Sequence, residues 1–330
     1  MVWCISKKIK SSGMKKLSIL TMVIILVIVI LSCKKNKSDY SNKEIVTVEK
    51  KEIDQKEDHE KDELGFDPSK PMMTKLKDGV YQYFQFFTNS LVVITDEGVL
   101  VVDPVNEKRA ADMRAEIRKI TDKPVVKVVY THDHFDHARG GQIFKEEGAE
   151  FITHQLCEDL LSRDLENRVV KPDFMYEGDY HRIELGGKYI DLHYLGPNES
   201  FCMSVVHLPQ NGGVLLGADW HLPGTMLDYH RQYARNMLGQ LNTFKAVKEK
   251  GLKFDIVVSA HSPHSSPEAF DEDYRFHQAL FDAVWKGLQD GKSVEVLRDS
   301  IELPEFKHWR GYENLPDNVD RMAYSIWHGN

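Results

Sequence analysis

The sequence has fewer basic than acidic residues, and this imbalance limits the partners to expect. In 330 residues there are 43 Lys and Arg against 51 Asp and Glu, for a formal net charge of −8. Residues 1–33 hold five of the lysines and no acid, so the rest of the chain carries 38 basic and 51 acidic side chains, or −13. Because nucleic-acid binding requires basic surface to neutralise phosphates, we expect no nucleic-acid partner.

Cysteine is also scarce, and the four present do not form a recognisable pattern. Cys4 and Cys33 lie in the N-terminal segment, which leaves Cys157 and Cys202 for the rest of the chain. Two residues are too few for a disulfide framework, and they lack the paired spacing of a thiolate zinc site. We therefore expect Cys157 and Cys202 only to pack in the core.

The N-terminal apolar segment, Leu17–Leu31, is shorter than the about 20 residues that a membrane-spanning helix needs. Five lysines precede or begin it, and it runs into "ILSC", Ile30–Cys33. A basic region, a short apolar region and a small residue before the cleavage point are typical of a secretory signal. The segment resembles a bacterial lipoprotein signal. That resemblance implies that Cys33 is lipidated and anchors the mature chain to a membrane of the bacterial cell envelope, facing the extracytoplasmic side.

Three regions follow from these patterns: a signal peptide at 1–33, a tether at 34–70 and a folded domain at 71–330. In the tether, 20 of 37 residues are charged. So little apolar surface cannot offset the entropy of ordering, and we expect disorder there. The remaining length suits one α/β domain with a sizeable core.

The folded domain alternates between strand and helix patterns. The runs "GVYQYFQFF", "SLVVIT" and "VLVVDPV" are rich in β-branched and aromatic residues and predict a meander of three strands. Further strands are expected at "VVKVVYT", "EFITH", "KYIDLHYLG", "MSVVHLP", "GVLLGAD" and "FDIVVSAH". Helices are expected at 107–120, 138–147, 158–167 and 233–250 and over most of 267–330. Polar residues end several of these strands, where loops can bring them together at one edge; they are Asp103, the cluster from Thr131 to His137, Asp219 and His261.

The stretch "YTHDHFDHARGG", residues 130–141, has the composition of a metal site. In an extended loop His132 and His134 point the same way and can bind one metal. Asp136 and His137 follow where the chain turns, and they can face a second metal about 3.5–4 Å away. Imidazole and carboxylate donors suit Zn²⁺ in a catalytic site. Asp133 is placed to orient the ligands without touching the metal, as is Thr131.

The motif "THDHFDHARGG" resembles the H-x-H-x-D-H signature of the metallo-β-lactamase superfamily, and the order of motifs extends the resemblance to about His264. It implies an αββα four-layer sandwich, here with a helical C-terminal extension. By the same resemblance Asp219 would bridge two Zn²⁺ ions, and His261 would bind the second with Asp136, the candidate catalytic residue, and His137. Asp103 would support the ligands from outside.

The third motif departs from the family, because Gly196-Pro197-Asn198-Glu199 has glutamate where a histidine is usual. Three interpretations stay open. Glu199 is an oxygen ligand of the metal, it is a solvated turn residue beside a site with one metal, or the protein is a degenerate family member without catalytic activity. Alkylsulfatase-like enzymes of the superfamily also place glutamates in this part of the site, which favours the first reading. As a ligand, Glu199 would make the site less positive and Mn²⁺ or Fe²⁺ more competitive with Zn²⁺.

The functional hypothesis is a lipid-anchored extracytoplasmic hydrolase that uses a metal-bound hydroxide on an ester, lactone, amide or sulfate bond of a small molecule. Two alternatives stay open: a non-haem iron oxygenase-type member of the same fold, and a degenerate metal-binding lipoprotein. Candidates for a substrate wall, for each of which packing is an equally good explanation, are His221, Tyr229, His230, Tyr233, His264, Trp309, Arg310 and Tyr312.

Overall fold

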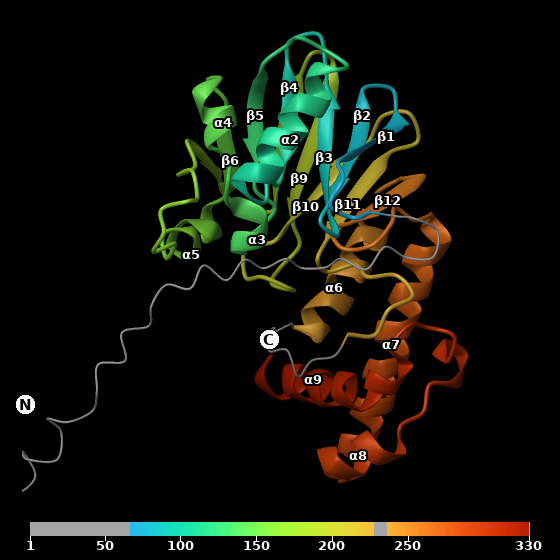
Figure 1. Ribbon diagram of the computed structural model, residues 1–330. Helices are drawn as coiled ribbons and strands as arrows, with labels where there is room; N and C mark the ends of the chain where they lie inside the picture. Colours follow the sequence, from blue (N-terminus) through green and yellow to red (C-terminus); the bar gives the residue numbers. More distant parts are fainter. Residues whose placement is uncertain (1–66, 228–235, 330) are drawn as a thin grey trace, which may run out of the picture. The chain divides into compact units, whose positions relative to one another are not determined.

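Two β-sheets carry the folded part of the protein in a computed structural model that describes residues 67–227 and 236–329 (Figure 1). The expected signal peptide, Cys33 and all but the last four residues of the expected tether lie outside the described residues. The first sheet has the strand order β1-β2-β3-β4-β5-β6-β7. Its β2–β4 part is the predicted meander, and β4 to β7 run parallel. The strands are β1 Met72–Lys77, β2 Val80–Gln85, β3 Thr88–Ile94, β4 Val99–Val102, β5 Val125–Val129, β6 Glu150–His154 and β7 Phe174–Tyr176.

The second sheet has the order β12-β11-β10-β9-β8 and is antiparallel except for the parallel pair β11 and β12. Four of its strands match the sequence patterns, whereas β8, and β1 and the short β7 of the first sheet, were not expected. All three of these strands lie at a sheet edge, where a strand needs less apolar sequence to be stable. The strands are β8 Tyr180–Leu185, β9 Lys188–Tyr194, β10 Ser204–Leu208, β11 Val214–Ala218 and β12 Ile256–Ser259.

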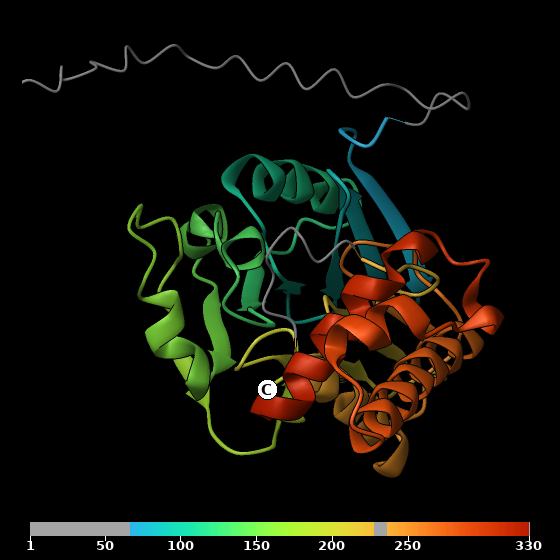
Figure 2. The same ribbon diagram turned by 90° about the horizontal axis from the view of Figure 1, so that it is seen from below.

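Three apolar clusters build the layers. The first lies between the two sheets and joins side chains such as Leu100 of β4 and Leu192 of β9. A second packs Met113 of α2 (Glu107–Arg118) against the outer face of the first sheet. A third packs Phe244 of α6 (Met237–Glu249) and Phe270 of α7 (Pro267–Gln289) against the second sheet. Figure 2 shows α2 on one side of the strands and the orange helices on the other, so the predicted αββα sandwich is confirmed.

The C-terminal extension is helical, as expected. The helices α7, α8 (Val294–Ser300) and α9 (Leu315–His328) share an apolar cluster that includes Phe276, Leu280 and Met322. Figure 1 shows them in orange and red below the sheets. Within residues 67–227 and 236–329, none of the helices combines the length and the apolar character needed to cross a membrane.

Two expected helices proved shorter than predicted. Instead of one helix at 138–147 there are α3 (Phe135–Ala138) and α4 (Gln142–Glu146). Between them Gly140 has φ +82° and lies against the backbone of Asn106, so the chain cannot continue as a helix there. The helix expected at 158–167 is only α5 (Glu158–Leu161). Its continuation is a loop, because the Asp164 carboxylate accepts hydrogen bonds from the backbone N–H groups of residues 166, 168 and 169.

The expectation that Cys157 and Cys202 only pack in the core was wrong. Their sulfurs are bonded at 2.04 Å, and their Cα atoms lie 5.2 Å apart. Cys157 ends the short 3₁₀ helix η1 (Gln155–Cys157), and Cys202 lies in the loop between β9 and β10. The bond therefore fixes the loop that carries Glu199 to the end of β6. A pairing across 45 residues depends on the tertiary fold, so spacing alone could not show it.

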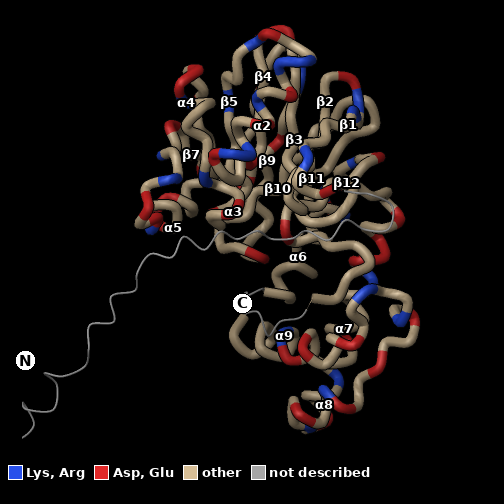
Figure 3. The backbone as a smooth tube through the Cα atoms, in the orientation of Figure 1, with Lys and Arg blue, Asp and Glu red and all other residues tan. Residues whose placement is uncertain are grey.

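Basic and acidic residues are interspersed along the described chain, as Figure 3 shows. Several ion pairs join segments that are far apart in sequence. Arg168 pairs with Glu107 at the start of α2, and Arg139 pairs with Asp164. The first pair joins the loop that carries Arg168 to α2, and the second joins the residue after α3 to the loop that follows α5.

Candidate metal centre

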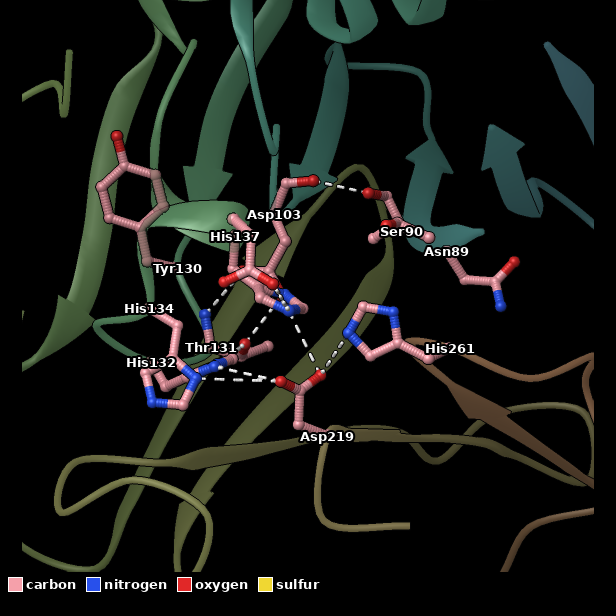
Figure 4. Close-up of polar contacts among 12 residues, drawn as sticks. Asn89, Ser90, Asp103, Tyr130, Thr131, His132, His134, His137, Asp219 and His261 are labelled. Atoms are coloured by element: carbon pink, nitrogen blue, oxygen red, sulfur yellow. Dashed lines mark hydrogen bonds and ion pairs between the residues drawn. The ribbon is translucent and has the colours of Figure 1, made fainter. Parts of the chain in front are cut away.

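The strands place the candidate ligands at one edge of the sandwich. Asp103 follows β4 and the segment from Thr131 to His137 follows β5, both in the first sheet. Asp219 follows β11 and His261 follows β12 in the second sheet. Figure 4 shows Asp219 lying between the pair His132 and His134 on one side and His261 on the other. The site is thus assembled from both sheets.

Asp219 is the centre of this arrangement, and its carboxylate is buried. Its Oδ2 lies 3.6 Å from His132 Nε2 and 3.8 Å from His134 Nδ1. Its Oδ1 lies 3.1 Å from His137 Nε2 and 3.3 Å from His261 Nε2. Each carboxylate oxygen therefore faces two imidazole nitrogens, which is the geometry expected of a group between two cations.

Hydrogen bonds on the far side of the rings decide which nitrogen faces the site. His261 Nδ1 lies 3.1 Å from the carbonyl oxygen of Phe87, which can only accept, so Nδ1 carries the proton. His137 Nδ1 lies 3.2 Å from Asp103 Oδ2 in the same way. In the neutral rings the Nε2 lone pair of each is then directed at Asp219. This is the tautomer that binds a metal.

Thr131 extends this control to His132. Its hydroxyl donates to Asp103 Oδ2 at 2.7 Å and lies 2.8 Å from His132 Nδ1. Because the hydroxyl has only one proton, it accepts from His132 Nδ1–H when it donates to Asp103. Asp103 also accepts the backbone N–H of Thr131 at 2.8 Å. One carboxylate thus orients two histidines.

Asp103 is itself held by residues that the sequence did not single out. Its φ of 57° lies in the left-handed region, which is uncommon for a residue other than glycine. Ser90 Oγ donates to its carbonyl oxygen at 2.5 Å, and Arg109 Nη1 donates to Ser90 Oγ at 2.8 Å. Arg109 is fully buried, and burial lowers the pKa of its guanidinium to about 10. The helical pattern of residues 107–120 did not indicate that Arg109 supports Asp103 through Ser90.

The His261 loop has a similar support. Asn89 Nδ2 in β3 donates to the carbonyl oxygens of Ser259 and Ser262, at 2.8 and 2.6 Å. The backbone N–H of Asn89 also donates to the carbonyl of Ala260 at 2.7 Å. The first sheet thereby fixes the loop that presents His261 from the second sheet. Nothing in the local sequence around Asn89 indicates this.

The electrostatics of the cluster favour a cation. Burial opposes ionisation of Asp219, yet the histidines around it hold the pKa of its carboxyl well below the usual range. Burial also disfavours a charged His137, but Asp219 and Asp103 raise the pKa of that ring well above its ordinary value. Burial lowers the pKa of His132. A buried carboxylate that draws protons onto its neighbours is a focus of negative potential, which a metal ion would satisfy.

The residues present fit two metal ions. Donor atoms lie within 4.8 Å of one another in His132–His134–Asp219 and in Asp136–His137–His261, and Asp103 forms a third group with His132 and His137. The Nε2 atoms of His132 and His137 are buried and make no hydrogen bond with the described residues. Buried nitrogens of this kind ordinarily have a partner, and a metal would be one. Asp136 is the most open member, since its side chain is 66% exposed.

Glu199 lies near this centre but in none of those groups of described residues. Its side chain is buried, and its negative charge helps to raise the pKa of His134 against the opposing effect of burial. The next residue, Ser200, donates from Oγ to Asp133 Oδ1. The loop after β9 is thereby bonded to the metal-ligand loop. Whether Glu199 binds a metal stays a prediction.

The candidates for a substrate wall divide into four groups. His221 and Trp309 are buried and pack inside the protein, His221 with its Nδ1 2.8 Å from Asp273. His264 bonds Gln82 through Nδ1 at 2.7 Å, and Tyr312 OH accepts the backbone N–H of Leu303. Arg310 is exposed. Outside the described residues are Tyr229, His230 and Tyr233.

Comparison with known proteins finds similarity to one superfamily. The profile of the Metallo-beta-lactamase superfamily matches residues 83–261. The chain is 23% identical over 235 residues to the 2,4-dinitroanisole O-demethylase subunit alpha of Nocardioides sp. (strain JS1661), covering 71% of this chain and 68% of that protein. It is 28% identical over 164 residues to the Metallo-beta-lactamase type 2 of Elizabethkingia meningoseptica, covering 47% and 64%.

Among solved structures, the stereoselective inverting sec-alkylsulfatase Pisa1 from Pseudomonas sp. matches with a TM-score of 0.67 at 18% identity. That match covers 78% of this chain and 50% of the sulfatase. The chain therefore spans half of the sulfatase and just under two thirds of the type 2 enzyme. Because the superfamily profile covers more than half of the sequence, the chain belongs to the metallo-β-lactamase superfamily.

Proposed function

We propose that this protein is a lipid-anchored, extracytoplasmic metallohydrolase that cleaves a small-molecule ester-type bond, with sulfate esters as the first class to test. The observation that carries the proposal is the pair of donor groups that meet at Asp219, one on each of its carboxylate oxygens. Metal ions held there would supply Lewis acidity and acidify a water molecule.

The chain's own residues have defined tasks in this proposal. Asp219 keeps the two donor groups together, because each of its oxygens faces one pair of rings. Asp103 and Thr131 hold His137 and His132 in the tautomers that present Nε2 to the site. Asp136, whose side chain is 66% exposed, would take a proton from an incoming water.

Two observations support the sulfate-ester class. The match to the alkylsulfatase covers 78% of this chain, a larger share than the superfamily profile, which matches residues 83–261. Glu199 also stands where the family usually has a histidine, and as a ligand it would make the first metal site less positive. A less positive site favours a substrate whose leaving group departs easily over one that requires a strongly acidified water.

The cellular location is proposed from the N-terminal segment and supported by the disulfide. A pair such as Cys157–Cys202 persists in oxidising compartments and is rare where thiols are kept reduced. The lipoprotein-like junction at Cys33 would bring the folded domain to such a compartment. Replacement of Cys33 by Ser should abolish lipid attachment and leave the precursor unprocessed; membrane retention and normal processing of that variant would contradict the anchor.

The activity is tested on the full chain in detergent. Metal content is measured first, and chromogenic sulfate, ester, lactone and β-lactam substrates are then screened. Replacing His132, His134, Asp136 or His137 singly by Ala should lower metal content and turnover together. Bound metal without turnover on any substrate class would point to a binding lipoprotein, and full metal occupancy in all four variants would show that the cluster is not the site.

A further inference from the structure

A second cluster of metal-ligating side chains lies outside the centre described above. Asp191 and His193 belong to β9, and His207 belongs to β10. One donor atom of each residue lies within 4.8 Å of the other two. The three residues are only 4%, 6% and 4% exposed, which is unusual for a carboxylate and two imidazoles.

Strand register brings these residues together on the outer face of the second sheet. Their neighbours Ile190 and Leu192 point into the core between the sheets. Because side chains alternate along a strand, Asp191 and His193 point away from that core. His207 is the direct cross-strand partner of Asp191. A cluster made by register in this way is rigid before any ligand binds.

Three ring nitrogens of the two histidines lack a hydrogen-bond partner among the described residues. His207 Nε2 lies 2.8 Å from the carbonyl oxygen of Lys253 and donates to it, so a neutral ring has its lone pair on Nδ1. That Nδ1, and both ring nitrogens of His193, are buried without a hydrogen-bond partner among the described residues. Leaving buried nitrogens unpaired costs free energy, which a bound cation would recover.

Asp191 is oriented in the way that ligating carboxylates usually are. Its Oδ1 accepts from Tyr180 OH at 2.9 Å and from Arg182 Nε at 2.6 Å, and its Oδ2 accepts from Arg182 Nη2 at 2.9 Å. A carboxylate has about four acceptor positions, so one on Oδ2 remains for a cation. Fixing a ligand by hydrogen bonds from outside, as here and at His207, is typical of metal sites.

We propose that Asp191, His193 and His207 form a structural site for a divalent transition-metal ion. Two imidazoles with one carboxylate suit Zn²⁺ or Cu²⁺ and are poor ligands for Mg²⁺ or Ca²⁺. Arg182 and Lys250 place positive charge near His193, which disfavours a cation held by charge alone. The site therefore selects metals that bind imidazole strongly. Donors on one zinc stand at most about 4 Å apart at Zn–N distances of about 2.0–2.1 Å, so small side-chain rotations would bring the three donors onto one ion and leave its fourth position to water.

The experiment counts metal ions in the full chain, purified in detergent and stripped with a chelator. Zn²⁺ is titrated into wild type, His193→Phe and His207→Phe. His181→Phe is the matched control, because it removes an imidazole from β8 of the same sheet that belongs to none of the donor groups. Wild type and control should bind one more equivalent than the two cluster variants. A double variant, His132→Ala with His137→Ala, should keep this equivalent, which separates it from the main centre.

A second readout covers the case in which the Phe variants do not fold. Asp191→Asn conserves the shape of the side chain and should weaken Zn²⁺ binding at this site at least tenfold. Cu²⁺ added to the His132→Ala, His137→Ala protein should give an electron paramagnetic resonance spectrum with coupling to two imidazole nitrogens, which His207→Gln, a replacement that keeps a polar side chain, reduces to one. Unchanged stoichiometry and affinity in the folded cluster variants, or a Cu²⁺ spectrum that is insensitive to His207, would overturn the proposal.

Discussion

Loss of the Cys157–Cys202 bond should destabilise the protein markedly. The bond closes a loop with a sequence separation of 45 residues. In the chain-entropy treatment, a loop of that size restricts the unfolded state by about 4 kcal/mol at 25 °C. For a domain of this size each kcal/mol shifts the melting temperature by about 2–4 °C, so the expected decrease is on the order of 10 °C. The unfolding midpoint in urea should fall, and the slope should rise, because the unfolded chain without the bond is less compact and exposes more surface.

The assay compares urea unfolding of the oxidised protein, the protein treated with dithiothreitol, and the variant Cys157→Ala with Cys202→Ala. The double variant should resemble the reduced protein and should not respond to reductant. Alkylation and mass measurement verify that both thiols are free after reduction. An unchanged midpoint with both thiols free would refute the reasoning, because it would mean that the closed loop adds no constraint to the unfolded chain.

Three further predictions concern single carboxylates. Glu199→Ala should lose metal at the first site, while Glu199→His should restore the family's usual ligand set and bind zinc more strongly relative to Mn²⁺, as measured by metal stoichiometry and competition; equal metal binding in all three proteins would make Glu199 a bystander. Asp103→Asn should lower zinc affinity by about 10–100-fold in a chelator competition, since it disturbs the tautomers of His137 and His132. Asp273 accepts hydrogen bonds from His221 and from the backbone N–H of Leu222. Burial alone would raise the pKa of its carboxyl, but His221 and His277 hold that pKa below the ordinary value. Its carboxylate thus stabilises the fold above about pH 4, and the stability is lost as the pH falls below that. Asp273→Asn should cost about 2–4 kcal/mol at pH 7 and progressively less below pH 4 in urea titrations; a difference that does not change with pH would contradict this.

Most of the fold could be predicted from sequence because its strands are strong local signals. Strands such as β4, β5 and β11 are runs of β-branched and aliphatic residues that end at turns, and period and length suffice to recognise them. The two helices that were predicted too long are each cut short by a specific contact. The helix expected at 138–147 is broken where Gly140 meets the backbone of Asn106, and the helix at 158–167 gives way to the hydrogen bonds of Asp164. Neither contact can be inferred from helical periodicity.

For the candidate metal centre, the candidate ligands could be predicted from the sequence, but the residues that fix those ligands in position could not. Histidines and carboxylates crowded at strand ends are visible in one dimension. Ser90, Asn89 and Arg109 are not, since each acts through a carbonyl or hydroxyl that reaches the site only in the folded protein. The cluster at Asp191 shows the same limit. Its two histidines lie on different strands, and only the register of β9 against β10 makes them neighbours.

The division of the candidate ligands between the sheets has a thermodynamic consequence. His132, His134 and His137 are presented by the first sheet, whereas Asp219 and His261 are presented by the second. A metal that requires ligands from both can bind fully only when the sheets are packed, so its binding free energy adds to the stability of the sandwich. Asn89 strengthens this coupling, because it bonds the first sheet to the loop that carries His261. Metal binding and sheet packing should therefore be lost together when the protein unfolds.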